Sequence, residues 1–130
     1  DCFHCHSLSL TSDGDLHNIG LDSVFTGVNA GYYNVSHNAA DYGKFRTPSL
    51  RNTALKTTFM HDARFTTLDQ VIEHYNTGVK HSPSLDPVMT KPGKELGLQL
   101  TPLEKQKLKA FLLTLTDSTF LTNPDFSNPN

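Results

Sequence analysis

The sequence has little of the material from which large or membrane-embedded proteins are built. It is 130 residues long, has no tryptophan and only two cysteines, and 36% of its residues are hydrophobic. Its longest apolar stretches, around Ala110 to Leu113, fall far short of the roughly 20 residues that a bilayer crossing needs. The formal charge of −2 offers no polycationic surface for phosphates. We therefore expect one domain with a modest core, no membrane span and no nucleic-acid partner.

The two cysteines stand close together, at Cys2 and Cys5, and a histidine follows the second. Cys2-Phe3-His4-Cys5-His6 matches C-x-x-C-H, the pattern of covalent c-type haem attachment. Two thiols on one turn can bond the two vinyl groups of one porphyrin, and the next imidazole then lies beneath the iron. The motif predicts one covalent haem c on Cys2 and Cys5, with His6 as the proximal iron ligand.

Three other uses of the cysteines compete with haem attachment. A local disulfide between Cys2 and Cys5 would leave the adjacent His6 unexplained. A structural zinc site needs four ligands and so a second cysteine or histidine cluster, which the sequence lacks. A thioredoxin-like redox pair belongs in a βαβ pattern, and no alternating strand pattern longer than four residues stands out. Haem attachment remains the strongest interpretation.

Covalent haem attachment takes place outside the cytoplasm, so the motif predicts a periplasmic or otherwise exported protein. A secretory signal, and in a cytochrome also a helix that packs across the C-terminal helix, normally precede the attachment site. The printed sequence has a single residue before Cys2. We expect a mature fragment, or the C-terminal part of a longer polypeptide, without that N-terminal helix.

The remaining patterns predict a mainly α, loop-rich fold. Residues 7–42 are rich in Ser, Asp, Asn and Gly and predict loop, as do the prolines and glycines of residues 81–98. Helices are expected where N-cap residues, capping boxes and apolar spacing coincide. These predicted helices are Thr47 to Ala54, Thr67 to Gly78 and Thr101 to Leu115. The tail after Asp117 should run along the surface or fray.

Several blocks of sequence follow one another in a specific order. They are Cys2 to His6, Lys44 to Asn52, Phe59 to Phe65, Thr67 to Asn76 and Ala110 to Asp117. In this order they resemble the C-terminal haem domain of bacterial dihaem cytochrome c peroxidases, including the MauG-like branch. The resemblance implies a single cytochrome c-like domain over residues 1–130.

That resemblance implies a role in electron transfer. The domain would accept electrons from a small donor protein and pass them to a peroxidatic haem domain, which this chain alone lacks. The chain would then be part of an oxidoreductase, a dihaem peroxidase. A freestanding monohaem electron carrier is the main alternative, and a gas or redox sensor domain is a third.

The sixth iron ligand decides the redox behaviour of such a haem, because axial ligands shift its potential over roughly 0.8 V. Methionine raises the potential, whereas a phenolate favours ferric iron. Counted from His61, the family's ligand position is occupied here by Tyr75, and MauG-like members use a tyrosine there. We rank Tyr75 first, Met60 second and Met89 third. Packing alone would also explain Tyr75 on an apolar helix face and Met60 in a core.

Two arginines, Arg46 and Arg51, could pair with haem propionates, since guanidinium groups bind carboxylates in bidentate geometry. We rank Arg51 above Arg46, because a solvated surface position explains Arg46 equally well. The resemblance places His61 and Asp62 in a loop beside the haem. They would orient the haem pocket, relay an electron or form a structural turn.

The resemblance also implies a calcium ion between domains, bound partly by the backbone carbonyls of Lys56 and Thr58. Lys56-Thr57-Thr58 stands where the family often has a threonine and a proline, which weakens the calcium prediction. His17, His37 and His81 lie in predicted loops without partner spacing, so we expect them at the surface.

Overall fold

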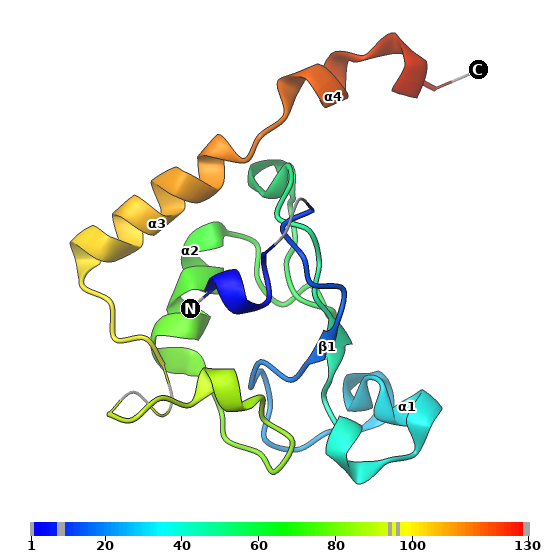
Figure 1. Ribbon diagram of the computed structural model, residues 1–130, viewed down its shortest axis with the longest axis vertical. Coiled ribbons are helices and arrows are strands. Elements are labelled where there is room, and N and C mark those ends of the chain that lie inside the picture. The colour runs from blue at the N-terminus through cyan, green and yellow to red at the C-terminus, as the bar shows by residue number, and fades with distance from the viewer. Residues whose placement is uncertain (1, 8–9, 94, 96, 129–130) are drawn as a thin grey trace.

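The computed structural model describes residues 2–7, 10–93, 95 and 97–128, and the long loops between its short elements follow the Gly, Pro, Ser and Asn content of the sequence (Figure 1). Residues 8, 9, 94 and 96 of the predicted loops lie outside this described part. The strands are β1 (Leu16–His17) and β2 (Phe45–Arg46), and the helices are α1 (Tyr33–Ser36), α2 (Leu68–Glu73), α3 (Pro102–Thr114) and α4 (Ser118–Thr122). Single turns of 3-10 helix are η1 (Cys2–His4), η2 (Gly27–Ala30), η3 (Ala39–Asp41), η4 (Thr53–Leu55), η6 (Pro87–Met89) and η7 (Pro124–Phe126), and η5 (His74–Gly78) is a π-helix.

The predicted helix that starts at Thr67 is confirmed, with one change in its second half. Thr67 and Gln70 form the expected capping box, which satisfies the free N–H groups at the start of α2. After Glu73 the chain widens into the π-helical turn η5, which ends at Gly78. Single π-turns are rare in proteins, but those that occur often lie at functional sites.

The predicted helix over Thr101 to Leu115 is confirmed as α3. Its capping box joins Thr101 and Glu104, and a proline occupies its first turn. α3 runs antiparallel to α2, because Lys105 pairs with Glu73 at 2.7 Å and Lys109 pairs with Asp69 at 2.5 Å. Both pairs are well exposed, so solvent screening leaves each with a small contribution to the stability of the contact.

The predicted helix over Thr47 to Ala54 is wrong. Thr47 to Leu50 has no regular secondary structure, and only η4 is helical in this region. The reason is tertiary: the backbone N–H of Thr47 donates to the Asp15 carbonyl at 3.0 Å and that of Leu50 to Thr11 Oγ1 at 2.8 Å. These bonds satisfy backbone groups of the segment without a helix, so the N-cap and proline pattern of Thr47-Pro48 does not produce one.

The β1–β2 ladder is short and antiparallel, with Leu16 opposite Arg46 and His17 opposite Phe45. It ties the first loop to the segment after α1. The tail after Asp117 is exposed, as expected, but folds into α4 and η7, and Figure 1 shows it extending away from the rest of the molecule. The loop over 7–42 contains several of the single turns.

The buried hydrophobic core of the described residues is small: Leu21, Ala30, Ile72 and Val79. Residues of the N-terminal turn η1, of α2 and of α3 line one shared cavity. Among the described residues, no helix has the length and hydropathy to cross a membrane. The architecture is therefore that of a shell of short elements around a cavity.

Candidate functional site: a haem-binding cavity

The N-terminal turn holds the predicted attachment residues in a fixed arrangement. The His6 backbone N–H donates to the Cys2 carbonyl at 2.8 Å, which closes one helical turn and brings both ends of the motif together. The backbone N–H of Asp13 donates to the Cys5 carbonyl at 2.8 Å and ties the turn to the following loop. The two thiols are not bonded to each other. Burial, with the nearby Asp13 and Asp86, raises the pKa of the Cys5 thiol to about 11. Very little of this thiol is therefore deprotonated at neutral pH.

The imidazole of His6 is oriented by a backbone carbonyl. Its Nδ1 lies 3.1 Å from the Thr11 carbonyl oxygen. A carbonyl only accepts, so Nδ1 carries the hydrogen and Nε2 is left with its lone pair. Metal-ligating histidines are held in this way, since the second-shell bond sets both the tautomer and the ring direction. His6 is therefore prepared to bind a metal through Nε2.

Cys2, Cys5 and His6 all face one cavity of about 460 Å³. This volume is within the usual range of ligand pockets, which are mostly apolar with a few placed polar groups. α2 and α3 supply apolar walls at Leu68, Val71, Ile72, Leu108 and Leu112, and the loops supply Ile19, Leu21, Phe25, Phe45, Pro48, Leu50, Phe59, Val88 and Leu98. The cavity therefore suits a large, flat, apolar group attached at the N-terminal turn.

The charges around the cavity are unbalanced in favour of cations. Among the described residues that line it, Arg46, Lys56 and Lys91 are cationic and Asp22 is the one carboxylate. Asp22 is already paired: the Arg64 guanidinium, together with Lys80, lowers the pKa of its carboxyl to about 2. The lining thus places the cationic side chains of Arg46 and Lys56 where they could pair with two propionates.

The structure brings all three candidate sixth ligands to the same cavity: Tyr75, Met60 and Met89. Tyr75 comes from the π-turn and lies close enough to the N-terminal turn for the thiols of Cys2 and Cys5 to affect it. Burial, and then these thiols, raise the pKa of the Tyr75 phenol. Met60 has a left-handed backbone with φ of 71° in the turn before His61. Met89 ends η6, whose start is capped by Asp86.

Arg51 is not brought to the cavity with the other predicted residues. It is exposed, its guanidinium carbon lies 5.9 Å from the centre of the Phe120 ring, and it lines a separate surface cavity beside the end of α3. Arg46, the weaker candidate from the sequence, lines the central cavity instead. The segment between the two arginines is not the helix that the sequence predicts, so the relative positions of residues 46 and 51 could not be inferred from helical spacing.

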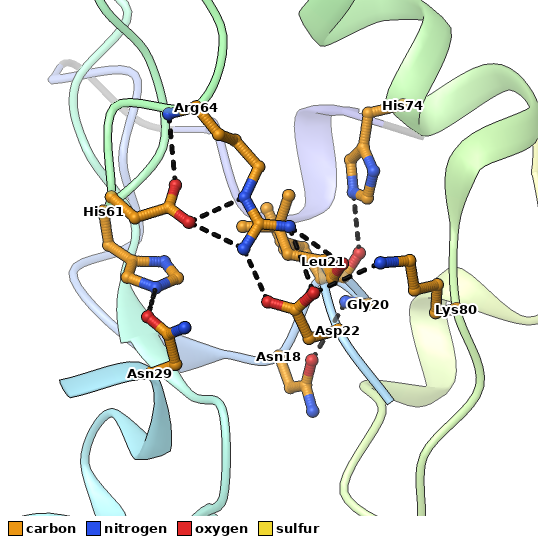
Figure 2. A network of polar contacts seen from close by, with 11 residues as sticks. Asn18, Gly20, Leu21, Asp22, Asn29, His61, Arg64, His74 and Lys80 are labelled. Carbon is orange, nitrogen blue, oxygen red and sulfur yellow. Dashed lines mark hydrogen bonds and ion pairs between the residues drawn. The ribbon is translucent and has the colours of Figure 1, made fainter. Parts of the chain in front are cut away.

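His61, Asp62 and Arg64 form part of a polar network at the cavity wall (Figure 2). The His61 ring lines the cavity, is stacked on Phe45 with 3.7 Å between ring centres, and bonds Asn29 at 3.0 Å. Arg64 donates to Asp62 at 2.7 Å and to the carbonyl of the cavity residue Leu21 at 3.1 Å. The loop that carries these residues is thus fixed to the cavity wall.

Three histidines were expected at the surface, and the structure confirms two of them. His37 and His81 are exposed. His17 is instead half-buried at the cavity wall, with Nδ1 2.5 Å from Asp86 and Nε2 2.9 Å from Asp13. Burial opposes the charged imidazolium, but the bonds to Asp86 and Asp13 outweigh it and raise the pKa of His17. The i, i+4 spacing of Asp13 and His17 was a usable signal, whereas Asp86 is 69 positions away.

Lys56 and Thr58, the residues expected to offer carbonyls to calcium, are exposed and line the central cavity. Among the described residues, the one group of three His, Cys, Asp or Glu side chains close enough to share a metal is Cys5, Asp13 and His17. Cys5 in that group belongs to the attachment motif. The calcium site stays a prediction.

The donor set fits a covalently attached haem. Two unpaired thiols and an oriented imidazole stand on one turn, three further donors line the same cavity, and cations are available in its lining. This combination matches the ligand and second-shell requirements of a c-type haem. It does not match zinc, which would need its four donors gathered around one point.

The chain was compared with known proteins. No protein-family model matches it. It is 31% identical to the cytochrome-c peroxidase IdrP2 of Denitromonas iodatirespirans, over 88% of this chain and 36% of that protein. It is 34% identical to the methylamine utilization protein MauG of Methylorubrum extorquens, over 88% of this chain and 30% of that protein.

Solved structures give the same picture. A MauG-like protein associated with microbial copper homeostasis superposes with a TM-score of 0.81 and 35% identity, over 98% of this chain and 46% of that one. The chain spans about a third of the length of the two curated relatives. These similarities agree with the helix-rich, cytochrome c-like fold expected from the sequence.

Proposed function

We propose that this chain, a member of the family of bacterial dihaem cytochrome c peroxidases and MauG-like proteins, is a c-type haem domain that transfers electrons. Cys2 and Cys5 would hold one haem c through thioethers, and His6 would bind its iron. The observation that carries the proposal is the bond between His6 Nδ1 and the Thr11 carbonyl, which leaves Nε2 for a metal at the edge of an apolar cavity. When bound, the haem supplies one-electron redox chemistry.

The side chains of the cavity divide the remaining work. The apolar walls from α2 and α3 exclude water, which strengthens the influence of each nearby charge. Arg46 would pair with a propionate, a role for which the sequence favours Arg51 over Arg46. His61, stacked on Phe45, would orient one wall of the haem pocket.

We assign the sixth ligand to Tyr75. Its phenol lies in the same cavity as His6 and close to the thiols that would anchor the haem. Burial keeps an isolated phenol neutral, and a bound ferric ion supplies the positive charge that favours its deprotonated form. A phenolate ligand stabilises ferric iron and lowers the reduction potential, so the reduced haem would pass its electron on readily to the next acceptor. Met60 and then Met89 are the alternatives.

Replacement of the Tyr75 hydroxyl tests this assignment. Tyr75→Phe should remove the phenolate-to-iron charge-transfer band of the ferric protein and raise the midpoint potential in a spectroelectrochemical titration. A near-infrared sulfur-to-iron band in the unmodified protein would show methionine ligation and contradict the assignment. Met60→Leu and Met89→Leu are the matched controls, and neither should change the charge-transfer band.

Within its family, the domain would be the C-terminal, electron-accepting part of an exported, periplasmic dihaem enzyme. It would take electrons from a small donor protein and pass them to a peroxidatic haem domain, with calcium as a further possible ligand between the two. A freestanding monohaem carrier is the second candidate. The gene sequence upstream of Cys2 separates them: a second C-x-x-C-H supports the enzyme, and its absence favours the carrier.

A further inference from the structure

The π-turn η5 places three consecutive side chains toward the interior of the molecule. His74 is 6% exposed, Asn76 is 5% exposed, and Tyr75 between them lines the cavity. In the π-turn the two buried side chains flank Tyr75, so the proposed ligand lies between two residues that are each fixed from a different side.

His74 fixes one side of this turn. Its Nε2 donates to the carbonyl of Ile19 at 3.0 Å, and Figure 2 shows the ring directed at the loop that carries Gly20 and Leu21. Ile19 itself lines the cavity. The bond therefore joins the residue before Tyr75 to the opposite wall of the haem pocket.

The segment before α3 fixes the other side. The backbone N–H groups of Leu98 and Gln99 donate to the carbonyls of Tyr75 and Asn76 at 2.9 and 3.2 Å. The N–H of Leu100 donates to Asn76 Oδ1 at 2.5 Å. These bonds satisfy acceptors that a continuing α-helix would use for its own next turn, so they hold the turn in its wide form.

Gly97 permits this close approach. It is buried with φ of 147°, and a Cβ at this position would lie 2.1 Å from the Asn76 carbonyl oxygen. Any side chain at residue 97 must therefore displace the π-turn or the segment that clamps it. The requirement for glycine here is a requirement of the turn that carries Tyr75.

We propose that the π-turn positions the Tyr75 phenol to bind the haem iron, and that His74 and Gly97 are the positioning residues of this turn. The inference rests on the proposed assignment of Tyr75. A ligand has to be held within about 0.5 Å of its working geometry, and the phenol oxygen stands at the far end of a long side chain. A small rotation of the backbone at residue 75 therefore takes the oxygen out of reach of the iron.

The test compares variants that differ in one property of the turn. His74→Phe keeps a ring but removes the donor to Ile19, whereas His74→Gln retains an N–H that can reach the same carbonyl. Gly97→Ala disturbs the same turn from the other side, and serves if His74→Phe does not fold. Thr67→Ala removes the cap of α2, so it lowers the stability of the same helix without touching the turn.

The readouts are the phenolate charge-transfer band, its resonance Raman modes and the midpoint potential of the ferric holoprotein. We expect His74→Phe and Gly97→Ala to lose most of the phenolate signal and to have a raised potential. We expect His74→Gln to retain the signal, and Thr67→Ala to retain it despite a lower melting temperature.

Three results would overturn the inference, and they are distinguishable. An unchanged phenolate signal in both His74→Phe and Gly97→Ala would show that the turn does not position the ligand, while the assignment of Tyr75 would stand. An equal loss in Thr67→Ala would show that general helix stability, not the turn, is responsible. A Tyr75→Phe spectrum identical to that of the unmodified protein would remove both the ligand assignment and this inference, and would leave the haem attachment untouched.

Discussion

Arg64 joins two loops of the haem pocket. The loss of stability on removal of its guanidinium follows directly from the hydrogen bonds that this group makes. The guanidinium donates to Asp62, to both carboxylate oxygens of Asp22 and to the Leu21 carbonyl (Figure 2). Leu21 is one of the few buried apolar residues and lines the cavity. Arg64 thus links the loop after Met60 to the wall on which the haem would rest.

The expected cost of Arg64→Met follows from these bonds. A hydrogen bond to a charged group contributes about 1.5–3 kcal/mol, but the side chains are 27% exposed at Arg64 and 23% at Asp22 and Asp62, so solvent screening reduces the sum. We expect the free energy of unfolding to fall by about 3 kcal/mol, and the melting temperature by roughly 10 °C. Because the chain has no tryptophan, urea and thermal unfolding are followed by circular dichroism.

The pH dependence gives a second check on the same variant. Arg64, together with the smaller effect of Lys80, lowers the pKa of Asp22 from 3.8 to about 2. This contribution to stability is present above the unfolded pKa and is lost as the pH falls through the folded one. The difference between the unmodified protein and Arg64→Met should therefore shrink between pH 4 and pH 2. A change in unfolding free energy below about 0.5 kcal/mol at neutral pH, the level of ordinary surface substitutions, would refute the reasoning.

Two further predictions concern polar residues of the first loop. Asp13 and Asp86 raise the pKa of His17. The stability that the charged His17 gives the fold is therefore complete below the unfolded pKa of 6.5 and is lost as the pH rises through the folded pKa. The stability advantage over His17→Asn should shrink over that range, and a difference independent of pH would contradict the pairing. Asn18 is 1% exposed and bonds Gly20 and three other partners. Asn18→Leu should lower the free energy of unfolding by about 2–4 kcal/mol in urea titrations, because the buried partners lose their bonds, and a loss below 1 kcal/mol would count against this explanation.

The sequence carries those features of the fold that depend on neighbouring residues. The attachment motif lies within one turn, and the capping boxes of Thr67 and Thr101 each need only the residue three positions later, so all three are predictable. The family resemblance supplied Tyr75 as a ligand candidate, and the structure places it in the cavity. Local patterns are thus a good guide to the helices and to the N-terminal half of the site.

The features that could not be predicted depend on partners far along the chain. The π-turn is held by Leu100, 24 positions after Asn76. The segment after Thr47 does not form a helix because it bonds residues more than thirty positions earlier. Arg51, the preferred candidate for the propionates, therefore lies outside the cavity that Arg46 lines. Hydrogen bonds to distant residues satisfy the backbone of these segments, and they outweigh the helix propensity of the local sequence.

The central claim is that Cys2 and Cys5 carry a haem through covalent bonds, and one measurement tests it most directly. Intact mass spectrometry of the purified protein, together with a pyridine haemochrome spectrum, should show one haem for each chain that denaturation does not release. Cys2→Ala with Cys5→Ala should abolish that covalent haem. A mass equal to the bare polypeptide, or a haem released by denaturation in acidified organic solvent, would contradict the account.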